Sequence, residues 1–404
     1  MTSLPPISRP HKSTRPSGKL AKTAGYYAAF LCIGLAASVL GPTLPGLAEN
    51  TGSQLSQISI LFTARSIGFL IGALTVGRIY DHVPGHPALA GGLLGMALII
   101  ALTPLASVLW LLVILLALLG LAESLIDVGT NTILPWLHHE NVAPYMNGLH
   151  FFFGVGAFLS PIIVAQVVLR SEEITWAYWL LALIMLPVAA WILPQSSPRP
   201  RTTATAVSAA VRPNYRLVIL ITLLFFLYVG AEISFGGWIY TYAVNSSLAT
   251  ITTAAYLTST FWGALMVGRL LSVPLANVTR PRKIIALGIA GSLFSIGLLL
   301  TWPGSAWALW LGTIGLGFSM SPIFPTTLSL AERNMPVTGK TTGWFFAGAS
   351  VGGMTLPWLV GQLFDAAGPY AAMVAIGLGV LGTAVVFGLM LLTLRNNPQE
   401  SGLK

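Results

Sequence analysis

The chain has 404 residues, of which 55% are hydrophobic and 8% charged, and its formal net charge is +9. Ordinary soluble domains carry about 25% charged residues, so this composition excludes a water-soluble fold. The single cysteine, Cys32, excludes an intrachain disulfide and a thiolate metal cluster. We therefore expect no cofactor.

The predicted elements are apolar runs, each long enough to cross a bilayer as one helix. There are twelve, over residues 24–46, 56–80, 86–105, 108–136, 142–169, 175–194, 216–242, 250–273, 283–302, 305–331, 341–364 and 370–394. The first run is too long for the core of a signal peptide, so no cleaved leader is expected. The sequence predicts an all-α membrane protein with twelve transmembrane helices.

The positions of the basic residues predict which ends of the spans share one side of the membrane. Of twenty lysines and arginines, eighteen fall at the termini or at the same ends of alternate spans. Arg269 is among these eighteen, whereas Arg170 falls on the opposite side and Arg65 inside a span. Such a bias is typical of cytoplasmic loops. We expect both termini in the cytoplasm, a cell (plasma or inner) membrane location, and a charge that encodes topology rather than a nucleic-acid partner.

An internal repeat divides the chain into two halves. The phrase Gly-Ala-Leu-x-Val-Gly-Arg occurs at 72–78 and again at 263–269, 191 positions later. Three further residues recur at a similar offset: Gly156, Pro161 and Gln166 return as Gly352, Pro357 and Gln362. Parallel repeats of this kind place a substrate site at their interface near the midplane.

The predicted domains follow from this division. They are a basic cytoplasmic tail (1–22), a six-helix bundle (23–195), a flexible cytoplasmic linker (196–214), a second six-helix bundle (215–395) and a cytoplasmic tail (396–404). The linker is assigned from its lack of hydrophobic periodicity and of acidic residues.

The loop after the second span carries a glycine and an aspartate four positions apart, Gly77 and Asp81. This pattern resembles the Gly-x-x-x-Asp signature of the major facilitator superfamily, and the resemblance covers all twelve spans. It implies that Asp81, with Gly77 and Arg78, latches the cytoplasmic ends of the two halves together. The alternative is that Asp81 caps a helix or pairs locally with Arg78.

Three carboxylates lie well inside predicted spans: Glu123, Asp127 and Glu232. Each charged group costs about 2.5–3.5 kcal/mol in a bilayer, so we interpret them as ion-coupling residues. Glu123, Asp127 and Asn131 recur every four residues and form one stripe on a helix, which must face a cavity. Asp127 is the leading coupling residue, and Asp127 with Asn131 is a possible Na⁺ site. The alternative for Glu123 is a structural ion pair with Arg65.

The same span permits a narrower comparison. The pattern Gly120, Asp127, Asn131 is similar to the fucose permease branch of the superfamily. That resemblance implies sugar and proton handling for Asp127 and Asn131. Residues 149–154 and 228–239 look more like the sodium-dependent glucose transporter group of the branch. The first span lacks the additional acidic residue of fucose permease, so Na⁺ and H⁺ both remain open as the coupling cation.

Further candidate substrate-binding residues lie in other spans. His150 can donate a hydrogen bond to a sugar hydroxyl, with a packing role as the alternative. Tyr228, Glu232 and Trp238 combine hydrogen-bonding groups with flat rings. Gly236 and Gly237 precede Trp238 and predict a broken helix that faces a cavity, with close helix packing as the alternative.

Two more features concern the last spans. Trp344 begins an aromatic run that we interpret as part of a substrate wall, although such runs are also packing or interface anchors. Pro322 and Pro325 stand three positions apart and predict an interruption of the tenth helix, which we interpret as a gate.

No P-loop, His-Glu-x-x-His or Gly-x-Ser-x-Gly motif is present, so the sequence indicates that the protein is not an enzyme. We expect a secondary active transporter that moves a hexose-like sugar with Na⁺ or H⁺ by alternating access. Its expected partners are this small molecule and membrane lipids, and it is expected to be a monomer. The alternatives are a proton-coupled exporter of drugs or other amphiphiles, and a sensor without turnover.

Overall fold

The computed structural model describes residues 16–138, 142–198, 214–335 and 337–395, and its regular elements are helices. They are α1 (Pro16–Thr51), α2 (Leu55–Ile58), α3 (Ile60–His82), α4 (Gly85–Leu102), η1 (Thr103–Leu105), α5 (Leu109–His138), α6 (Ala143–Ser171), α7 (Thr175–Ile192), α8 (Tyr215–Asn245), α9 (Ile251–Val278), α10 (Pro281–Thr301), α11 (Ala306–Met320), α12 (Ile323–Asn334) and α13 (Gly339–Arg395).

Eleven of the described segments are long and apolar enough to cross a membrane. The last of them, α13, contains two helices that meet at Gly368. The φ of Gly368 is +83°, a conformation that glycine adopts without steric cost, and Pro369 follows it. Because α13 turns back at this residue, it supplies two spans, which agrees with the twelve predicted from the sequence.

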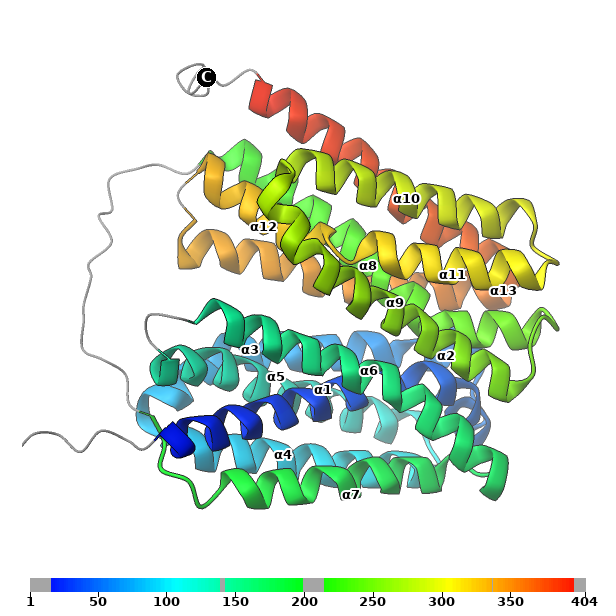
Figure 1. The fold of residues 1–404 in the computed structure, drawn as a ribbon. Coiled ribbons are helices and arrows are strands. Elements are labelled where there is room, and N and C mark those ends of the chain that lie inside the picture. The colour runs from blue at the N-terminus through cyan, green and yellow to red at the C-terminus, as the bar shows by residue number, and fades with distance from the viewer. Residues whose placement is uncertain (1–15, 139–141, 199–213, 336, 396–404) are drawn as a thin grey trace, which may run out of the picture.

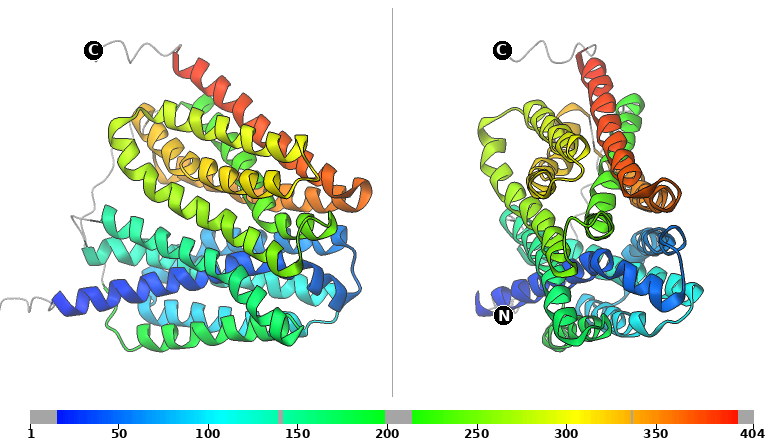
Figure 2. Two further views of the ribbon diagram at one scale, coloured as in Figure 1. Left: turned by 45° about the vertical axis from the view of Figure 1, so that its right-hand side comes forward. Right: turned by 90° about the vertical axis from the view of Figure 1, so that its right-hand side faces the viewer.

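The helices form two bundles, α1–α7 and α8–α13, which lie one above the other in Figure 1. We call the side that carries Gln195 and Asn214 the linker side, and the side that carries Thr51 and Gly368 the distal side. The bundles meet towards the distal side, and their helices diverge towards the linker side (Figures 1 and 2).

Glycines set the closest helix crossings, and they do so at matching places in the two bundles. A Cβ at Gly156 of α6 would overlap the backbone carbonyl of Leu31 in α1. A Cβ at the repeat-related Gly352 of α13 would overlap the carbonyl of Phe226 in α8. Small residues let helix backbones approach this closely, so the sequence repeat corresponds to a repeated packing contact.

Prolines account for two local features of the backbone. The predicted interruption of the tenth span is confirmed, because α11 ends at Met320 and α12 begins at Ile323. In α6, Pro161 has no N–H to donate to the Ala157 carbonyl one turn earlier. The Ser38 hydroxyl of α1 donates to that carbonyl instead, at 2.8 Å.

The predicted break at Gly236 and Gly237 is wrong, because α8 continues without interruption from Tyr215 to Asn245. A Cβ at Gly41 of α1 would lie 3.0 Å from the Gly236 carbonyl oxygen and 3.2 Å from that of Gly237. The two glycines therefore serve the alternative role, close helix packing, at a point where the first bundle touches the second.

Candidate functional site

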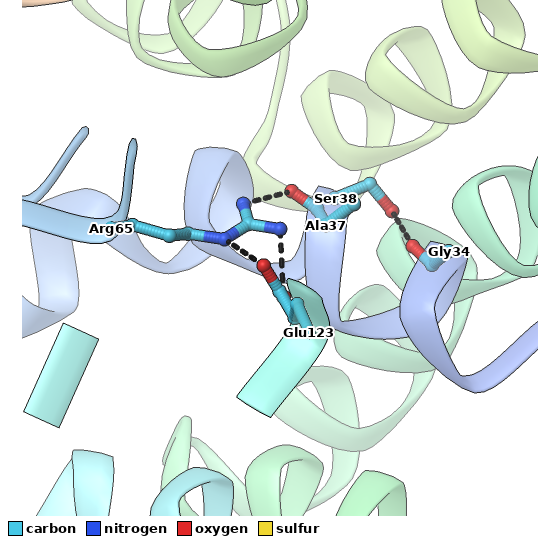
Figure 3. A network of polar contacts seen from close by, with 5 residues as sticks. All are labelled: Gly34, Ala37, Ser38, Arg65 and Glu123. Carbon is cyan, nitrogen blue, oxygen red and sulfur yellow. Dashed lines mark hydrogen bonds and ion pairs between the residues drawn. The ribbon is translucent and has the colours of Figure 1, made fainter. Parts of the chain in front are cut away.

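A buried ion pair forms the polar centre of the first bundle (Figure 3). Arg65 of α3 donates through Nε and one terminal nitrogen to the two carboxylate oxygens of Glu123 in α5, at 2.9 and 2.8 Å. Its other terminal nitrogen donates to the Ala37 carbonyl of α1 at 3.1 Å. This pair is the structural alternative predicted for Glu123, and it ties three helices together.

Asp127 lies one turn along α5 from Glu123 and is not part of this ion pair. Asn131 donates through Nδ2 to the backbone carbonyl of Asp127 at 2.9 Å and to its carboxylate at 3.3 Å. Both side chains keep some accessible surface. Within the described residues no cluster of three or more His, Cys, Asp or Glu side chains could hold a metal ion. A bound Na⁺ would therefore combine Asp127 and Asn131 with backbone or ligand oxygens.

A second polar group lies where the two bundles meet. Glu232 of α8 and His150 of α6 both interact electrostatically with Arg269 of α9. Glu232 and Arg269 do not form a direct ion pair, since Arg65 and Glu123 form the one ion pair among the described residues. His150 is exposed, and its ring also packs edge-on against Phe30 at 5.6 Å between centroids.

Arg269 lies further from the end of its helix than the sequence predicts. The helix continues for nine residues beyond it, to Val278, whereas the predicted span continues for four. Sequence reasoning missed it because the predicted span ended at residue 273. The repeat carried a usable signal, since Arg269 closes the second copy of the repeated phrase without the acidic residue that follows Arg78.

Of the predicted aromatic residues, Tyr228 lies beside this polar group and interacts electrostatically with Glu232 and Arg269. Tyr228 is buried and donates to the Met320 carbonyl at 3.0 Å. Trp238 is also buried, and its indole N–H donates to the Pro357 carbonyl at 3.0 Å. Its ring packs between Phe62 and Phe364, so in this conformation Trp238 belongs to the contact between the bundles.

Two candidates lie near the linker side. Trp344 is 56% exposed and lies within two turns of the start of α13. Gly77 lies near the end of α3, and apart from its own helix turn no described atom lies within 4 Å of the place that a Cβ would occupy. The side chains of Arg78 and Asp81 lie outside the part of the chain that the structure describes, so the latch stays a prediction.

Two glutamines related by the repeat cross between the bundles on the distal side. Gln166 of α6 donates to the Tyr256 hydroxyl of α9. Gln362 of α13 donates to the Ser56 carbonyl of α2 at 2.7 Å. The repeated sequence thus supplies a repeated cross-bundle hydrogen bond.

Further hydrogen bonds close this side. The Ser56 backbone N–H donates to the Asp365 carboxylate at 2.7 Å, and the Thr63 hydroxyl donates to the Met354 carbonyl at 2.9 Å. Among the residues that the structure describes, every hydrogen bond between the bundles lies towards the distal side. The distal side is therefore closed.

The distal face also holds a cavity of about 650 Å³ between the bundles. Its lining includes the acidic residues Glu49, Glu172 and Glu173, together with Tyr240 of the second bundle. Sequence reasoning placed these acidic residues in loops or at span ends and gave them no role. The cavity lies on the closed side of the molecule, apart from Asp127 and Arg269.

The fold and these sites can be compared with known proteins. The profile described as Major Facilitator Superfamily matches residues 26–336. Sodium-dependent glucose transporter 1A of Mus musculus is 30% identical over 396 residues, which cover 89% of this chain and 92% of that protein. Major facilitator superfamily domain-containing protein 4A of Homo sapiens is 27% identical over 484 aligned positions, with 95% and 93% covered.

A solved structure supports the fold alone. A crystal structure of an aspartate-to-alanine mutant of the nucleoside transporter NupG aligns with a TM-score of 0.74 at 12% identity, covering 93% of this chain and 99% of that one. The family profile covers most of the chain, and the helical architecture agrees with it. The chain therefore belongs to the Major Facilitator Superfamily, and it is a multi-pass membrane transporter rather than an enzyme.

Proposed function

We propose that the protein is a secondary active transporter that carries a hexose-like sugar together with one Na⁺ or H⁺ by alternating access. The relative of similar length named as a sodium-dependent glucose transporter supports the choice of sugar and cation. The observation that carries the proposal is that the negative and positive side chains in the interior of the spans do not balance.

Away from the span ends, the described chain holds two arginines and three carboxylates. They are Arg65, Arg269, Glu123, Asp127 and Glu232. Arg65 neutralises Glu123 through two hydrogen bonds, and Arg269 interacts electrostatically with Glu232. Asp127 is left without a basic partner. Because an uncompensated charge in a membrane is costly, one monovalent cation at Asp127 would restore neutrality.

The closed distal side supports the cycle that we propose. With the linker side in the cytoplasm, as the positive residues predict, this conformation faces inward. Glycine contacts such as Gly156 on Leu31 hold each bundle together, so the bundles rock as units. Release of the distal hydrogen bonds would open the same site to the outside.

Uptake by purified protein in proteoliposomes tests this function. We expect labelled D-glucose to accumulate when a Na⁺ or a pH gradient, imposed separately, points inward. Accumulation under one gradient identifies the cation. Stimulation by neither gradient, together with inhibition by lipophilic cations, would contradict sugar symport and favour the exporter.

Asp127→Asn tests the coupling residue. We expect it to abolish gradient-driven accumulation while exchange of labelled for unlabelled sugar continues, because the amide removes the charge but keeps the shape. Glu332→Gln is the matched control, since Glu332 is exposed near the linker-side end of α12, and it should accumulate sugar normally. Full accumulation by Asp127→Asn would rule out the role.

A further inference from the structure

One face of α9 carries polar side chains into the junction between the bundles. Ser259, Trp262, Met266 and Arg269 are spaced three, four and three residues apart, so they share one helix face. A Cβ at Gly154 of α6 would lie 2.8 Å from the Met266 side chain. This face of α9 therefore points towards the first bundle.

Trp262 of α9 lies between the neighbouring helices α6 and α8. A Cβ at Gly236 of α8 would lie 2.7 Å from the Trp262 ring, and the following residue of α9, Gly263, packs against Phe158 of α6. Trp262 thus lies where α6, α8 and α9 converge. Arg269 lies two turns further along the same face and interacts with groups on α6 and α8.

Both side chains have a buried donor without an acceptor. Trp262 is 9% exposed, and within the described chain neither its indole N–H nor the Nε–H of Arg269 has a hydrogen-bond partner. An unsatisfied buried polar group costs about 1–3 kcal/mol, and such groups are uncommon in native proteins. Of the eight such atoms in the described chain, three lie on this one face, on Ser259, Trp262 and Arg269. Their grouping at the junction where a repeat-built transporter places its substrate indicates a ligand.

The chemistry of the two donors limits the ligand. An indole N–H and a guanidinium can donate and cannot accept, so the ligand presents oxygen acceptors. The charge of Arg269 already has a counterpart in Glu232, so the ligand needs no charge of its own. The indole ring adds a flat apolar surface.

The spacing suits a monosaccharide. Seven residues of helix rise about 10 Å, and the Arg269 side chain is long, so a ligand the size of one sugar ring can be reached from both positions.

We propose that Trp262 and Arg269 are substrate-binding residues that donate hydrogen bonds to two hydroxyl oxygens of a neutral, hydroxyl-rich ring. This inference rests on the proposed sugar transport and names the donors that select its substrate. The competing explanation is that Trp262 only packs and Arg269 only balances the charge of Glu232.

Transport kinetics in proteoliposomes separate the two explanations. Trp262→Phe keeps a ring but removes the N–H, and Arg269→Lys keeps the charge but removes Nε. One lost hydrogen bond is worth about 1 kcal/mol, so we expect about a five- to tenfold rise in the KM for D-glucose in each variant, with little change in kcat. Trp307→Phe is the matched control, because Trp307 is 79% exposed, and its KM should not change.

The KM values for a panel of monodeoxy glucoses distinguish a binding role from a structural role. For one position of the ring, removal of the hydroxyl should raise the KM of the wild type but not raise that of Trp262→Phe further. The same should hold for Arg269→Lys, at that position or another. A KM that rises equally for every analogue, or stays at the wild-type value in both variants, would overturn the proposal.

A competition experiment with the wild-type protein tests the charge of the ligand independently of any variant. Glucuronate should compete with labelled D-glucose for the wild-type protein more weakly than unlabelled glucose does. Competition by glucuronate at least tenfold stronger than by glucose would overturn the assignment of a neutral ligand. A wild-type protein that carries no hexose would instead contradict the proposed function itself.

Discussion

The two bundles share their backbone crossings but hold their interior charges differently. In the first bundle, Arg65 and Glu123 form a direct, bidentate ion pair. In the second, Arg269 and Glu232 interact without a direct bond, and the Nε of Arg269 has no partner within the described chain. We infer that the first pair stabilises the fold, whereas the second is left open for a ligand. The two copies of the repeat keep the same packing contacts where the bundles must be rigid, and they differ in sequence where the bundles would contact the substrate.

The largest expected effect comes from removing one partner of the ion pair between Arg65 and Glu123. Arg65→Gln leaves Glu123 buried without its partner, which should lower the free energy of unfolding by about 3–5 kcal/mol. Thermal unfolding of the purified protein in detergent measures this loss. Arg269→Gln removes no direct ion pair and should cost much less.

The double variant Arg65→Gln, Glu123→Gln sharpens the same contrast. It removes both charges together, so it should recover most of the stability that Arg65→Gln loses. If Arg269→Gln proved as destabilising as Arg65→Gln, the distinction between the directly bonded pair of the first bundle and the unbonded pair of the second would fail.

A smaller effect is expected from the glycine crossings, which test what the bundles have in common. Gly156→Ala and Gly352→Ala each place a methyl group against a backbone carbonyl of the neighbouring helix. Overpacking of this kind costs about 1–3 kcal/mol, and the two variants should lose similar stability in thermal unfolding.

Gly91→Ala is the control for both, because apart from its own helix turn no described atom lies within 4 Å of its Cβ position. Alanine favours a helix over glycine, so this variant should be unchanged or slightly more stable. A loss in Gly156→Ala without a loss in Gly352→Ala would show that the two crossings are not equivalent.

The smallest effect is expected on the distal side. Gln166→Leu removes one cross-bundle hydrogen bond and Gln362→Leu removes two. Because one such bond is worth about 1 kcal/mol, each variant should shift the population by about fivefold or more towards the conformation that is open on the distal side. Labelling of a cysteine introduced at Ser59, with Cys32 replaced by alanine, measures the opening. Unchanged labelling in both variants would show that these bonds do not hold the distal side closed.

The sequence was sufficient for features that depend on local chemistry. Apolar length predicted the spans, and Pro322 predicted the interruption between α11 and α12, because a proline cannot donate within a helix. The four-residue spacing of Glu123, Asp127 and Asn131 placed them on one face of α5.

Features that depend on distant neighbours were missed. Gly236 and Gly237 are compatible with either a break or a close contact, and the contact is decided by Gly41, almost 200 residues earlier. The free donors on Trp262 and Arg269 are likewise visible only once α6 and α8 are in place around α9. Hydropathy alone had put Arg269 at the end of its span.

The excess of one carboxylate in the interior has an electrical consequence for the proposed cycle. With a cation at Asp127 the loaded site is neutral, whereas the empty site carries one negative charge through the return step. A charge that crosses the full membrane field changes its energy by about 2.3 kcal/mol per 100 mV. A membrane potential that is negative inside therefore drives the empty site outward. We expect turnover to rise with this potential even when the cation and sugar gradients are held constant.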